Sequence, residues 1–474
     1  MSDKQVSNPV DTVIDLWRHG VHSVDARRLV RNYVRLEGDQ LVMGEQRLGL
    51  ADFDRIRVVG AGKVAGAMAE ALEDALGPNL MLSKNVSGLV NVPYGKYGGR
   101  LSTGSRVWQF PARPAGENLP TAGAFGATLL MEDLVERAGS RELCFCLLSG
   151  GASALLTHPP KKVKLQDKRK LIQWLSGTGA SIQQINTIRK HVSDVKGGRL
   201  ASRFKGFHMV CLMISDVIGN APGLIGSGPT VKDLSTPEEA LSILSQLDPK
   251  LRHTPVSIQR HLKRAGVPVD IPGNVTNHVI GHLSLAINEA MEFGSAQGYD
   301  CLSEIQTDEL ETVETAGVRL GQWILDQLKR PREKPRVIIS GGEPVIELAN
   351  QPGTGGRNSH LVLTALQHLL DSGVDPRQPF ALLAGGTDGE DGNAPAAGAW
   401  ISNQTLARTK QLKLNPGPFL KACNSHQFFA RLGCGIFHGL PQYRTNVSDL
   451  RIGYVGCGIQ GRLATNRSSG EPSP

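Results

Sequence analysis

Four apolar runs in this sequence each end in a turn rich in residue types that bind anions and divalent cations. Glycine lets backbone N–H groups approach an anion closely, and aspartate can supply oxygen ligands to a cation. Apolar runs of this length, bounded by turns, indicate buried strands, usually of a parallel sheet, and α/β proteins bind ligands at the carboxyl ends of such strands. The four turns occupy residues 149–153, 215–216, 340–343 and 385–391.

Two basic residues follow glycine-rich segments, and each could bind an anionic group. Lys63 comes after Gly60 and Gly62, which places its ammonium group at the start of the next helix, where backbone N–H groups also favour an anion. Arg357 ends a flexible glycine loop at 353–356 and could hold a phosphate or carboxylate through two parallel hydrogen bonds. The alternatives are a surface lysine beside a structural turn and a solvated arginine after a plain turn.

Carboxylates after two of the strands could hold magnesium. Asp388 and Asp391 follow the strand expected at 380–384, and Asp216 follows an earlier strand. Magnesium in phosphoryl-transfer sites is held by one or two carboxylates together with waters and phosphate oxygens, so either group would suffice. An ordinary acidic turn is the alternative interpretation.

The known sequence motifs for nucleotide binding and for acyl transfer are incomplete in this chain. A Rossmann dinucleotide site needs an acidic residue about twenty positions after its glycines, and residues 81–116 contain none. A Walker A loop needs Ser or Thr after its lysine, where this chain has Val64. Ser149 and Ser153 lack the G-x-S-x-G turn of a hydrolase nucleophile. A nicotinamide enzyme, a P-loop ATPase and a serine hydrolase are therefore disfavoured.

The elements around these motifs alternate between strands and helices, which predicts βαβ units and an α/β fold with a parallel sheet. A chain of 474 residues is too long for one hydrophobic core, and the loop-rich stretch at 249–276 indicates a domain junction. A second α/β unit is expected to begin near residue 279. Helices are expected at 11–18, 25–36, 64–76, 122–137, 283–297 and 359–370, and further strands at 55–59 and 86–92.

Composition argues against several other classes of protein. The net charge of +8 suits anionic small molecules, but an aromatic content of 5% and basic segments without interleaved aromatics argue against a nucleic-acid partner. The densest basic stretch, at 161–170, is expected to be the solvent-exposed start of a helix. The 7 cysteines form no disulfide framework, and neither an apolar leader nor a membrane span is evident, so a cytoplasmic protein is expected.

A set of short segments, in a fixed order from about residue 10 to residue 457, resembles the glycerate 2-kinase family. The resemblance implies a larger, Rossmann-like doubly wound N-terminal domain at 9–250 and a smaller C-terminal α/β region at 275–460. That region contains a MOFRL domain at about 335–457, and the active site is expected in the cleft between the two domains. The segments are 58–63, 148–156, 185–191, 195–201, 214–219, 226–230, 340–344, 355–358, 385–389, 424–426 and 445–447.

The activity implied by this resemblance is phosphorylation of D-glycerate at its 2-hydroxyl, with ATP and Mg²⁺ as cofactors. The implied partners are the hydroxy acid and ATP, with no nucleic acid and no membrane, and a homodimer is left open. The family's catalytic residues fall on Lys63 and Arg357. Phosphate binding by the backbone is expected from Ser149, Gly150, Gly151, Ala152 and Ser153. We also expect Arg189, Lys196, Asn358 and Asn446 to bind substrate or phosphate, and the carboxylates noted above, Asp216, Asp388 and Asp391, to bind magnesium.

The chain also departs from the family pattern, mostly at acidic positions. The family usually has Asp where Thr121 and Asn220 stand, and Gln-Glu where Ser359 and His360 stand. Such losses would alter magnesium binding or substrate choice, or mark a homologue that binds its ligands without turning them over. A hydroxypyruvate reductase is a third alternative, against which the missing ribose-binding acid argues. Further departures lie at Asn393, Ala394 and Pro395 and at Gln442, Tyr443 and Arg444.

Overall fold

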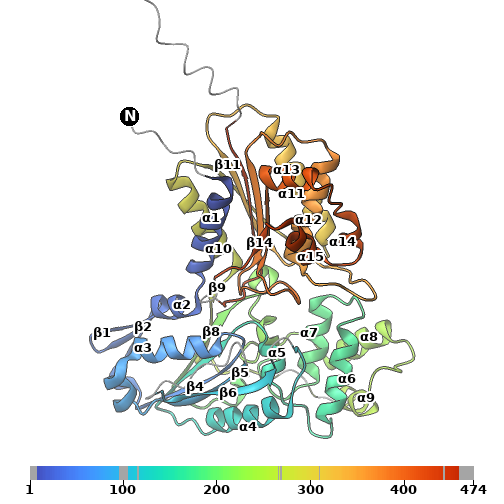
Figure 1. Ribbon diagram of the computed structural model, residues 1–474. Helices are drawn as coiled ribbons and strands as arrows, with labels where there is room; N and C mark the ends of the chain where they lie inside the picture. The colour runs from blue at the N-terminus through green and yellow to red at the C-terminus, as the bar shows by residue number, and fades with distance from the viewer. Residues whose placement is uncertain are drawn as a thin grey trace, which may run out of the picture. The chain divides into compact units, whose positions relative to one another are not determined.

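The computed structural model divides the chain into two compact units, which are described separately below (Figure 1). One unit consists of Ala26–His282, and the other combines Met1–Asp25 with Leu283–Pro474. Within them the structure describes residues 8–94, 105–114, 117–264, 266, 269–308, 310–440 and 444–457.

The unit of residues 26–282 is built on a six-stranded sheet in which every neighbouring pair of strands is parallel. The strand order β6-β5-β4-β7-β8-β9 is the order of the Rossmann fold, and it reverses direction between β4 and β7. Ligands of such sheets bind outside the carboxyl ends of the strands at this switch point. The strands are β4 (Arg55–Ala61), β5 (Ser87–Tyr94), β6 (Val107–Pro114), β7 (Glu142–Leu148), β8 (His208–Ile214) and β9 (Val275–Gly281).

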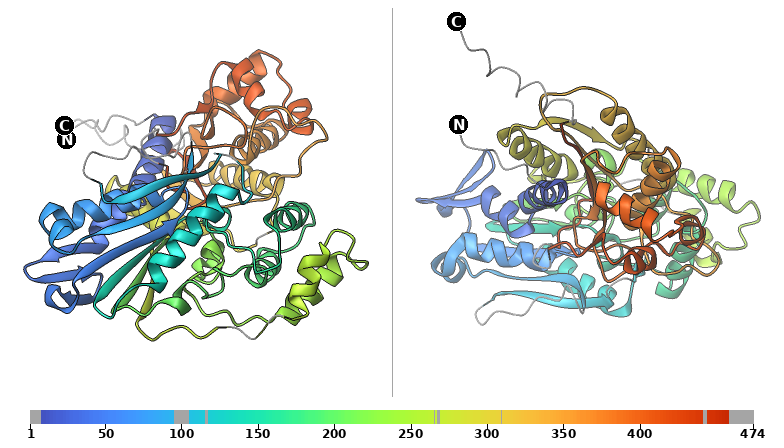
Figure 2. Two further views of the ribbon diagram at one scale, coloured as in Figure 1. Left: turned by 90° about the horizontal axis from the view of Figure 1, so that it is seen from below. Right: turned by 45° about the horizontal axis from the view of Figure 1, so that its top comes forward.

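Helices cover both faces of this sheet, as the apolar runs of its strands require. Figure 1 shows α3 (Ala65–Ser83) and α4 (Ala122–Glu136) on opposite sides, and Figure 2 shows the sheet from below with α4 lying along it. Small and apolar side chains of α4, such as Ala127 and Met131, pack against Cys144 and Cys146 of β7. The unit also contains α2 (Ala26–Tyr33), the antiparallel strands β1 (Val34–Glu37), β2 (Gln40–Met43) and β3 (Gln46–Gly49), and the helices α5 (Ala152–Leu155), α6 (Leu165–Leu175), α7 (Ile182–His191), α8 (Pro237–Leu247) and α9 (Val256–Leu262).

The other unit contains a mixed six-stranded sheet in the order β10-β11-β15-β12-β13-β14. The last strand of the chain, β15, lies antiparallel between β11 and β12, so its first residue, Asp449, pairs with Gly342 and Gly386 at the ends of its two neighbours. The start of β15 therefore shares one edge of the sheet with the carboxyl ends of β11 and β12. The strands are β10 (Asp300–Ile305), β11 (Arg336–Gly342), β12 (Phe380–Gly386), β13 (Gly398–Ser402), β14 (Ile436–Phe437) and β15 (Asp449–Val455).

Two pairs of helices enclose this second sheet. One apolar core lies under α11 (Val313–Leu328) and α12 (Arg357–Asp371), and the other lies under α1 (Pro9–Ser23) and α10 (Leu283–Ala296). Figure 1 shows these pairs on opposite sides of the strands. Trp17 of α1 is fully buried, and its indole N–H donates to the Gly385 carbonyl at 3.3 Å. The remaining helices are α13 (Asn403–Gln411), α14 (Gly417–Lys421) and α15 (Ser425–Leu432).

The α/β class and the two-unit organisation agree with the prediction, but the boundaries of the two units differ from it. Residues 9–23 form α1 and pack with the second unit, although the sequence placed them in a domain at 9–250. The strand at 275–281 completes the first sheet, whereas the sequence assigned residue 279 to the start of the second unit. Across the described residues, no helix combines the length and the apolar character needed to span a membrane.

Candidate active site

The turn after β4 and the loop after β7 are hydrogen-bonded to each other at the switch point of the first sheet. The backbone N–H of Lys63 donates to the Gly150 carbonyl at 2.8 Å, and that of Ser149 donates to the Ala61 carbonyl at 3.2 Å. The Ser149 hydroxyl accepts a hydrogen bond from the N–H of Val64 at 3.2 Å, just before α3 begins. Lys63 and the 149–153 loop, which the sequence proposed separately, are therefore neighbours.

Two glycines are required for this contact. A Cβ on Gly62 would lie 2.0 Å from the Ser149 hydroxyl oxygen, so no side chain fits there. Gly151 has a φ of +80°, and a Cβ there would lie 3.0 Å from the Arg113 guanidinium and 3.5 Å from Cγ of Lys63. The side chains of Lys63 and Arg113 thus approach the same backbone position. Arg113 was not proposed from the sequence, because it lies near the end of an edge strand, β6, that contains two prolines.

A hydrogen-bonded network connects this loop to α7. The hydroxyls of Ser153 and Ser227 lie 2.8 Å apart, and Ser227 donates to the side-chain oxygen of Asn186 on α7 at 2.7 Å. The Lys196 ammonium donates to the Gly226 carbonyl at 2.8 Å. Lys196 therefore lies beside Ser227, which contacts Ser153 of the loop.

Arg189 and Lys196 lie in a poorly hydrated environment. Lys196 is 1% exposed, and burial lowers its pKa well below the usual range, assisted by the charges of Lys168 and Arg189. Burial also lowers the pKa of the Arg189 guanidinium. Desolvated cations interact strongly with an anion, because little water screens the attraction.

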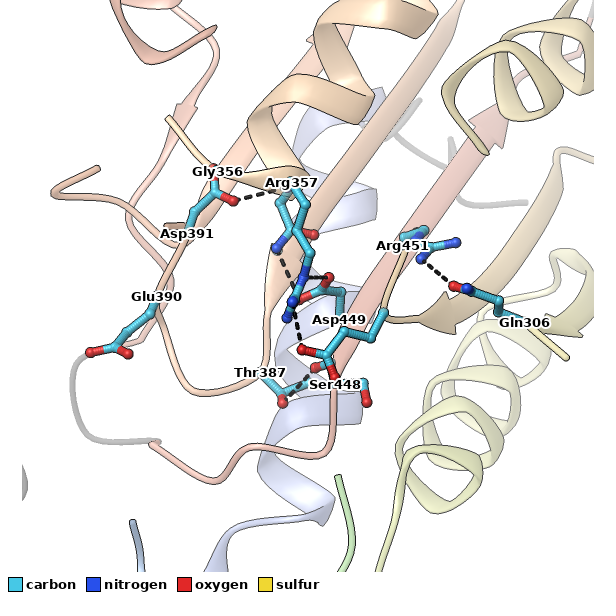
Figure 3. Close-up of polar contacts among 12 residues, drawn as sticks. Gln306, Gly356, Arg357, Thr387, Glu390, Asp391, Ser448, Asp449 and Arg451 are labelled. Atoms are coloured by element: carbon cyan, nitrogen blue, oxygen red, sulfur yellow. Dashed lines mark hydrogen bonds and ion pairs between the residues drawn. The ribbon is translucent and has the colours of Figure 1, made fainter. Parts of the chain in front are cut away.

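In the second unit, Arg357 is the first residue of α12 and pairs with two carboxylates, that of Asp449, which Figure 3 shows, and that of Glu343. Its Nε donates to Asp449 at 2.7 Å, and its Nη1 lies 2.5 Å from Glu343. The Asp449 and Glu343 charges and their hydrogen bonds outweigh the effect of burial and raise the pKa of Arg357. Asn358 donates to the other oxygen of Asp449 at 3.0 Å, so Asp449 orients two neighbouring candidate residues at once.

The glycine loop before Arg357 is fixed by hydrogen bonds, although the sequence favoured a flexible loop. The amide oxygen of Asn393 accepts from the N–H of Gly355 at 2.8 Å, and that of Asn424 accepts from the N–H of Thr354 at 2.9 Å. A Cβ on Gly356 would lie 2.3 Å from Asp391, so the chain passes too close there for any side chain. The loop therefore gives Arg357 one position at the start of α12.

The two acidic candidates after β12 have different surroundings. Asp391 is 1% exposed, and its two oxygens accept hydrogen bonds from the backbone N–H groups of Asn358 at 2.8 Å and Ser359 at 3.0 Å. Burial raises the pKa of Asp391 to about 6, against the effect of these hydrogen bonds. Asp388 instead accepts from the N–H of Glu390 at 3.1 Å within its own turn. Asp391 thus caps α12.

The remaining candidates lie in turns beside the strand ends. The amide oxygen of Asn446 accepts from the N–H of Ser448 at 3.0 Å in the turn before β15. Thr387 joins this turn to the acidic turn, since its hydroxyl donates to the Ser448 carbonyl and accepts from the N–H of Val447 (Figure 3). In the first unit, the half-buried Asp216 follows β8, one strand from β7. No group of three or more metal-ligating side chains gathers within the described residues.

Two family models and several known proteins match this chain. A family model described as "Domain of unknown function (DUF4147)" matches residues 12–263, and the MOFRL family model matches residues 336–449. The D-glycerate 2-kinase of Thermotoga maritima is 32% identical over 87% of this chain and 93% of that protein. The chain belongs to the glycerate 2-kinase family.

Other members of the glycerate 2-kinase family are also similar to this chain over most of its length. The glycerate 2-kinase of Pyrococcus horikoshii is 30% identical over 92% of this chain and 94% of that protein. A crystal structure of glycerate kinase from Thermotoga maritima matches 94% of this chain and 99% of its own, with 30% identity and a TM-score of 0.77. The similarity therefore spans both units.

Several departures from the glycerate 2-kinase pattern have structural roles. Thr121 caps α4, since its hydroxyl accepts from the N–H of Ala124 at 3.0 Å. Ser359 lies 2.8 Å from the Ser425 hydroxyl, and His360 is 2% exposed with its Nε2 3.1 Å from Glu314. Burial lowers the pKa of His360, against the charge of Glu314.

Two further departures, at Asn220 and Asn393, also fit their surroundings. Asn220 has a φ of +54°, a conformation that Asn and Asp tolerate better than most residues, so this position suits either side chain. Asn393 holds the glycine loop, as described above. Gln442 and Tyr443 lie outside the described residues.

Proposed function

We propose that this enzyme transfers the γ-phosphoryl group of ATP to the 2-hydroxyl of D-glycerate, giving 2-phosphoglycerate and ADP. A bond forms between the hydroxyl oxygen and the γ-phosphorus, the bond from that phosphorus to the β–γ bridging oxygen breaks, and the hydroxyl proton is released. The observation that carries the proposal is the contact of the Lys63 turn with the 149–153 loop at the switch point. This position is where such a sheet binds phosphates.

Phosphoryl transfer depends on positioning and on charge neutralisation more than on covalent chemistry. Lys63 supplies a positive charge beside the backbone of Gly150 and Gly151, and we assign it to the transferred phosphoryl group. Arg357 supplies a planar guanidinium whose orientation is fixed by Asp449, and we assign it a charge-stabilising role toward an anionic group of the substrates. Ser149 and Ser153 contribute hydrogen-bonding groups from the loop.

Bound Mg²⁺ would neutralise phosphate charge during the transfer. Mg²⁺ that arrives with ATP requires only one or two carboxylates, since phosphates and water complete its coordination. Asp388 and Asp216 suit this requirement because each follows a strand at the ligand-binding edge of its sheet. Asp391 suits it less well, because both of its oxygens accept hydrogen bonds from the start of α12.

The alternative of a nicotinamide-dependent reductase receives little support from the first sheet. In a Rossmann fold, an acidic residue near the end of the second strand binds the ribose hydroxyls. Here Asn91, near the end of β5, is fully buried and donates to the Leu155 carbonyl at 2.7 Å. The Asn91 side chain therefore holds the neighbouring loop and supplies no carboxylate for a ribose. The kinase remains the preferred assignment.

A coupled assay for ADP release tests the proposal. The purified protein is mixed with ATP, Mg²⁺ and one of several hydroxy acids, namely D-glycerate, L-glycerate, tartronate and D-lactate. We expect ADP release with D-glycerate above all others, because the D-glycerate 2-kinase of Thermotoga maritima resembles this chain over most of its length. Oxidation of NADH by hydroxypyruvate without ADP release would identify a reductase, and nucleotide binding without turnover would identify a non-catalytic homologue.

A further inference from the structure

Lys168 has no role in the site as described so far. The sequence predicted that the basic stretch at 161–170 is solvated, but Lys168, on α6, is 0% exposed. Its ammonium nitrogen makes no hydrogen bond to any described residue. A buried ammonium without a partner is unfavourable, because it has lost its water without gaining an acceptor. Such a group either loses its proton or gains an anionic partner from a ligand.

Lys168 is coupled electrostatically to two further basic residues. Its surroundings include Arg189 of α7 and Lys196 of the following loop, and their charges influence one another. Asp194 is the carboxylate that acts on Lys168, and it also acts on Arg199. Among the described residues, no carboxylate pairs with Arg189 or Lys196. The three cations therefore carry more positive charge than the neighbouring side chains balance.

The ligand of this cluster must be small. Lys168 and Lys196 are 0% and 1% exposed, whereas Arg189 is only partly buried. A triphosphate chain needs an extended, open surface, but a single carboxylate can enter such a site. The planar guanidinium of Arg189 also matches the two oxygens of a carboxylate.

The cluster adjoins the loop that we assign to phosphate. Asn186 and Arg189 are three residues apart on α7, so they share one face of that helix. Asn186 connects through Ser227 to Ser153, and Lys196 donates to the Gly226 carbonyl beside Ser227. An acid bound at the cluster would thus lie close to the loop at 149–153.

We propose that Lys168, Arg189 and Lys196 form the site that binds the carboxylate of the hydroxy-acid substrate. This inference rests on the proposed function for the identity of the acid, and it assigns Lys168 as a residue that determines substrate specificity. A neutral polyol of the same size would lack the group that this site binds.

The test compares Lys168→Met, in which a neutral side chain of similar length replaces the lysine, with Lys170→Met, the same change at an exposed position of α6. We expect Lys168→Met to raise the KM for D-glycerate at least about 10-fold, because a desolvated charged hydrogen bond is lost. The KM for ATP should stay within about 2-fold, and Lys170→Met should match the wild type. The melting temperature of Lys168→Met should not fall, since an uncompensated buried charge has been removed.

Binding measured without ATP separates this inference from the proposed function. Calorimetric titration with D-glycerate should show binding to the wild type and about 10-fold weaker binding to Lys168→Met, whereas glycerol should bind to neither. If the wild type binds D-glycerate in this manner but never phosphorylates it, the carboxylate site stands and the kinase proposal fails. An unchanged D-glycerate affinity in Lys168→Met, or a raised KM for ATP alone, would overturn the inference. Lys168→Gln serves as a second neutral variant if Lys168→Met does not fold.

A pH series supplies a further readout. Burial, together with the charge of Arg189, lowers the pKa of Lys168 to about 7, while Asp194 opposes that shift. The cationic form binds a carboxylate, so the KM for D-glycerate should rise as the pH increases from 6 to 9. This rise should be smaller in Lys168→Met, which has no proton to lose. A pH dependence identical in both proteins would contradict the assignment.

Discussion

Asp449 offers the sharpest test of how the second unit positions Arg357. The carboxylate is 2% exposed and accepts hydrogen bonds from Nε of Arg357 at 2.7 Å, from Nη2 of Arg357 at 3.4 Å and from the Asn358 amide at 3.0 Å. In Asp449→Asn the side chain keeps its size but loses its charge and one acceptor. Whichever way the new amide is turned, its NH₂ group faces a donor, either that of Arg357 or that of Asn358.

The size of the effect follows from these contacts. Removing one partner of a buried ion pair typically destabilises a protein by about 3–5 kcal/mol. Arg357 retains Glu343 at 2.5 Å, and its side chain is 31% exposed, so we expect the lower end of that range, about 3 kcal/mol. Because Arg357 would lose its fixed orientation, kcat should fall by roughly 10- to 100-fold.

Urea unfolding and steady-state kinetics measure the two effects separately. Asp15→Asn is the matched control, because Asp15 pairs with Arg18 at 3.2 Å on an exposed face of α1 in the same unit. The control should change neither stability nor kcat appreciably. A folded Asp449→Asn enzyme with wild-type stability and a kcat within about 2-fold of wild type would refute this account of Arg357.

Three further substitutions test the remaining assignments. Lys63→Ala should lower kcat/KM by about 100-fold or more, since one preorganised charge is removed, and near-normal turnover would make Lys63 a surface residue. Arg357→Lys should be nearly as damaging as Arg357→Ala, because an ammonium lacks the planar fork, and full activity would show that a point charge suffices. Gly62→Ala should abolish most activity, because its Cβ would lie 2.0 Å from the Ser149 hydroxyl oxygen. Gly126→Ala, where no atom lies within 4 Å, should retain activity, and equal losses in both variants would contradict the packing argument.

The strands and turns at the ligand-binding edge could be predicted because their signals are local. An uninterrupted apolar run such as that of β7 indicates a buried strand, and the glycines after it indicate a turn. Lys63 and the 149–153 loop were recognised independently, and strand order then places them together. The resemblance to the family supplied the activity, which no single motif specifies.

Features that depend on distant partners could not be predicted. Asp449 and Arg451 interrupt the apolar pattern of β15, so this strand did not resemble a buried one, although both residues are nearly inaccessible to solvent. The tertiary packing of α1 likewise assigns residues 9–23 to the second unit. Lys168 lies in a basic stretch that is typical of a solvated helix, and its burial follows from the packing of α6 rather than from its neighbours in sequence.

The most direct test of the central claim is the identity of the product. The protein is incubated with ATP, Mg²⁺ and D-glycerate, and the mixture is followed by ³¹P nuclear magnetic resonance. We predict that one new phosphomonoester appears, with its phosphorus coupled to the single proton on C2, as in 2-phosphoglycerate, and that ADP forms in equal amount. Formation of 3-phosphoglycerate, whose phosphorus couples to the two protons on C3, or ATP that stays intact beside D-glycerate, would contradict the account.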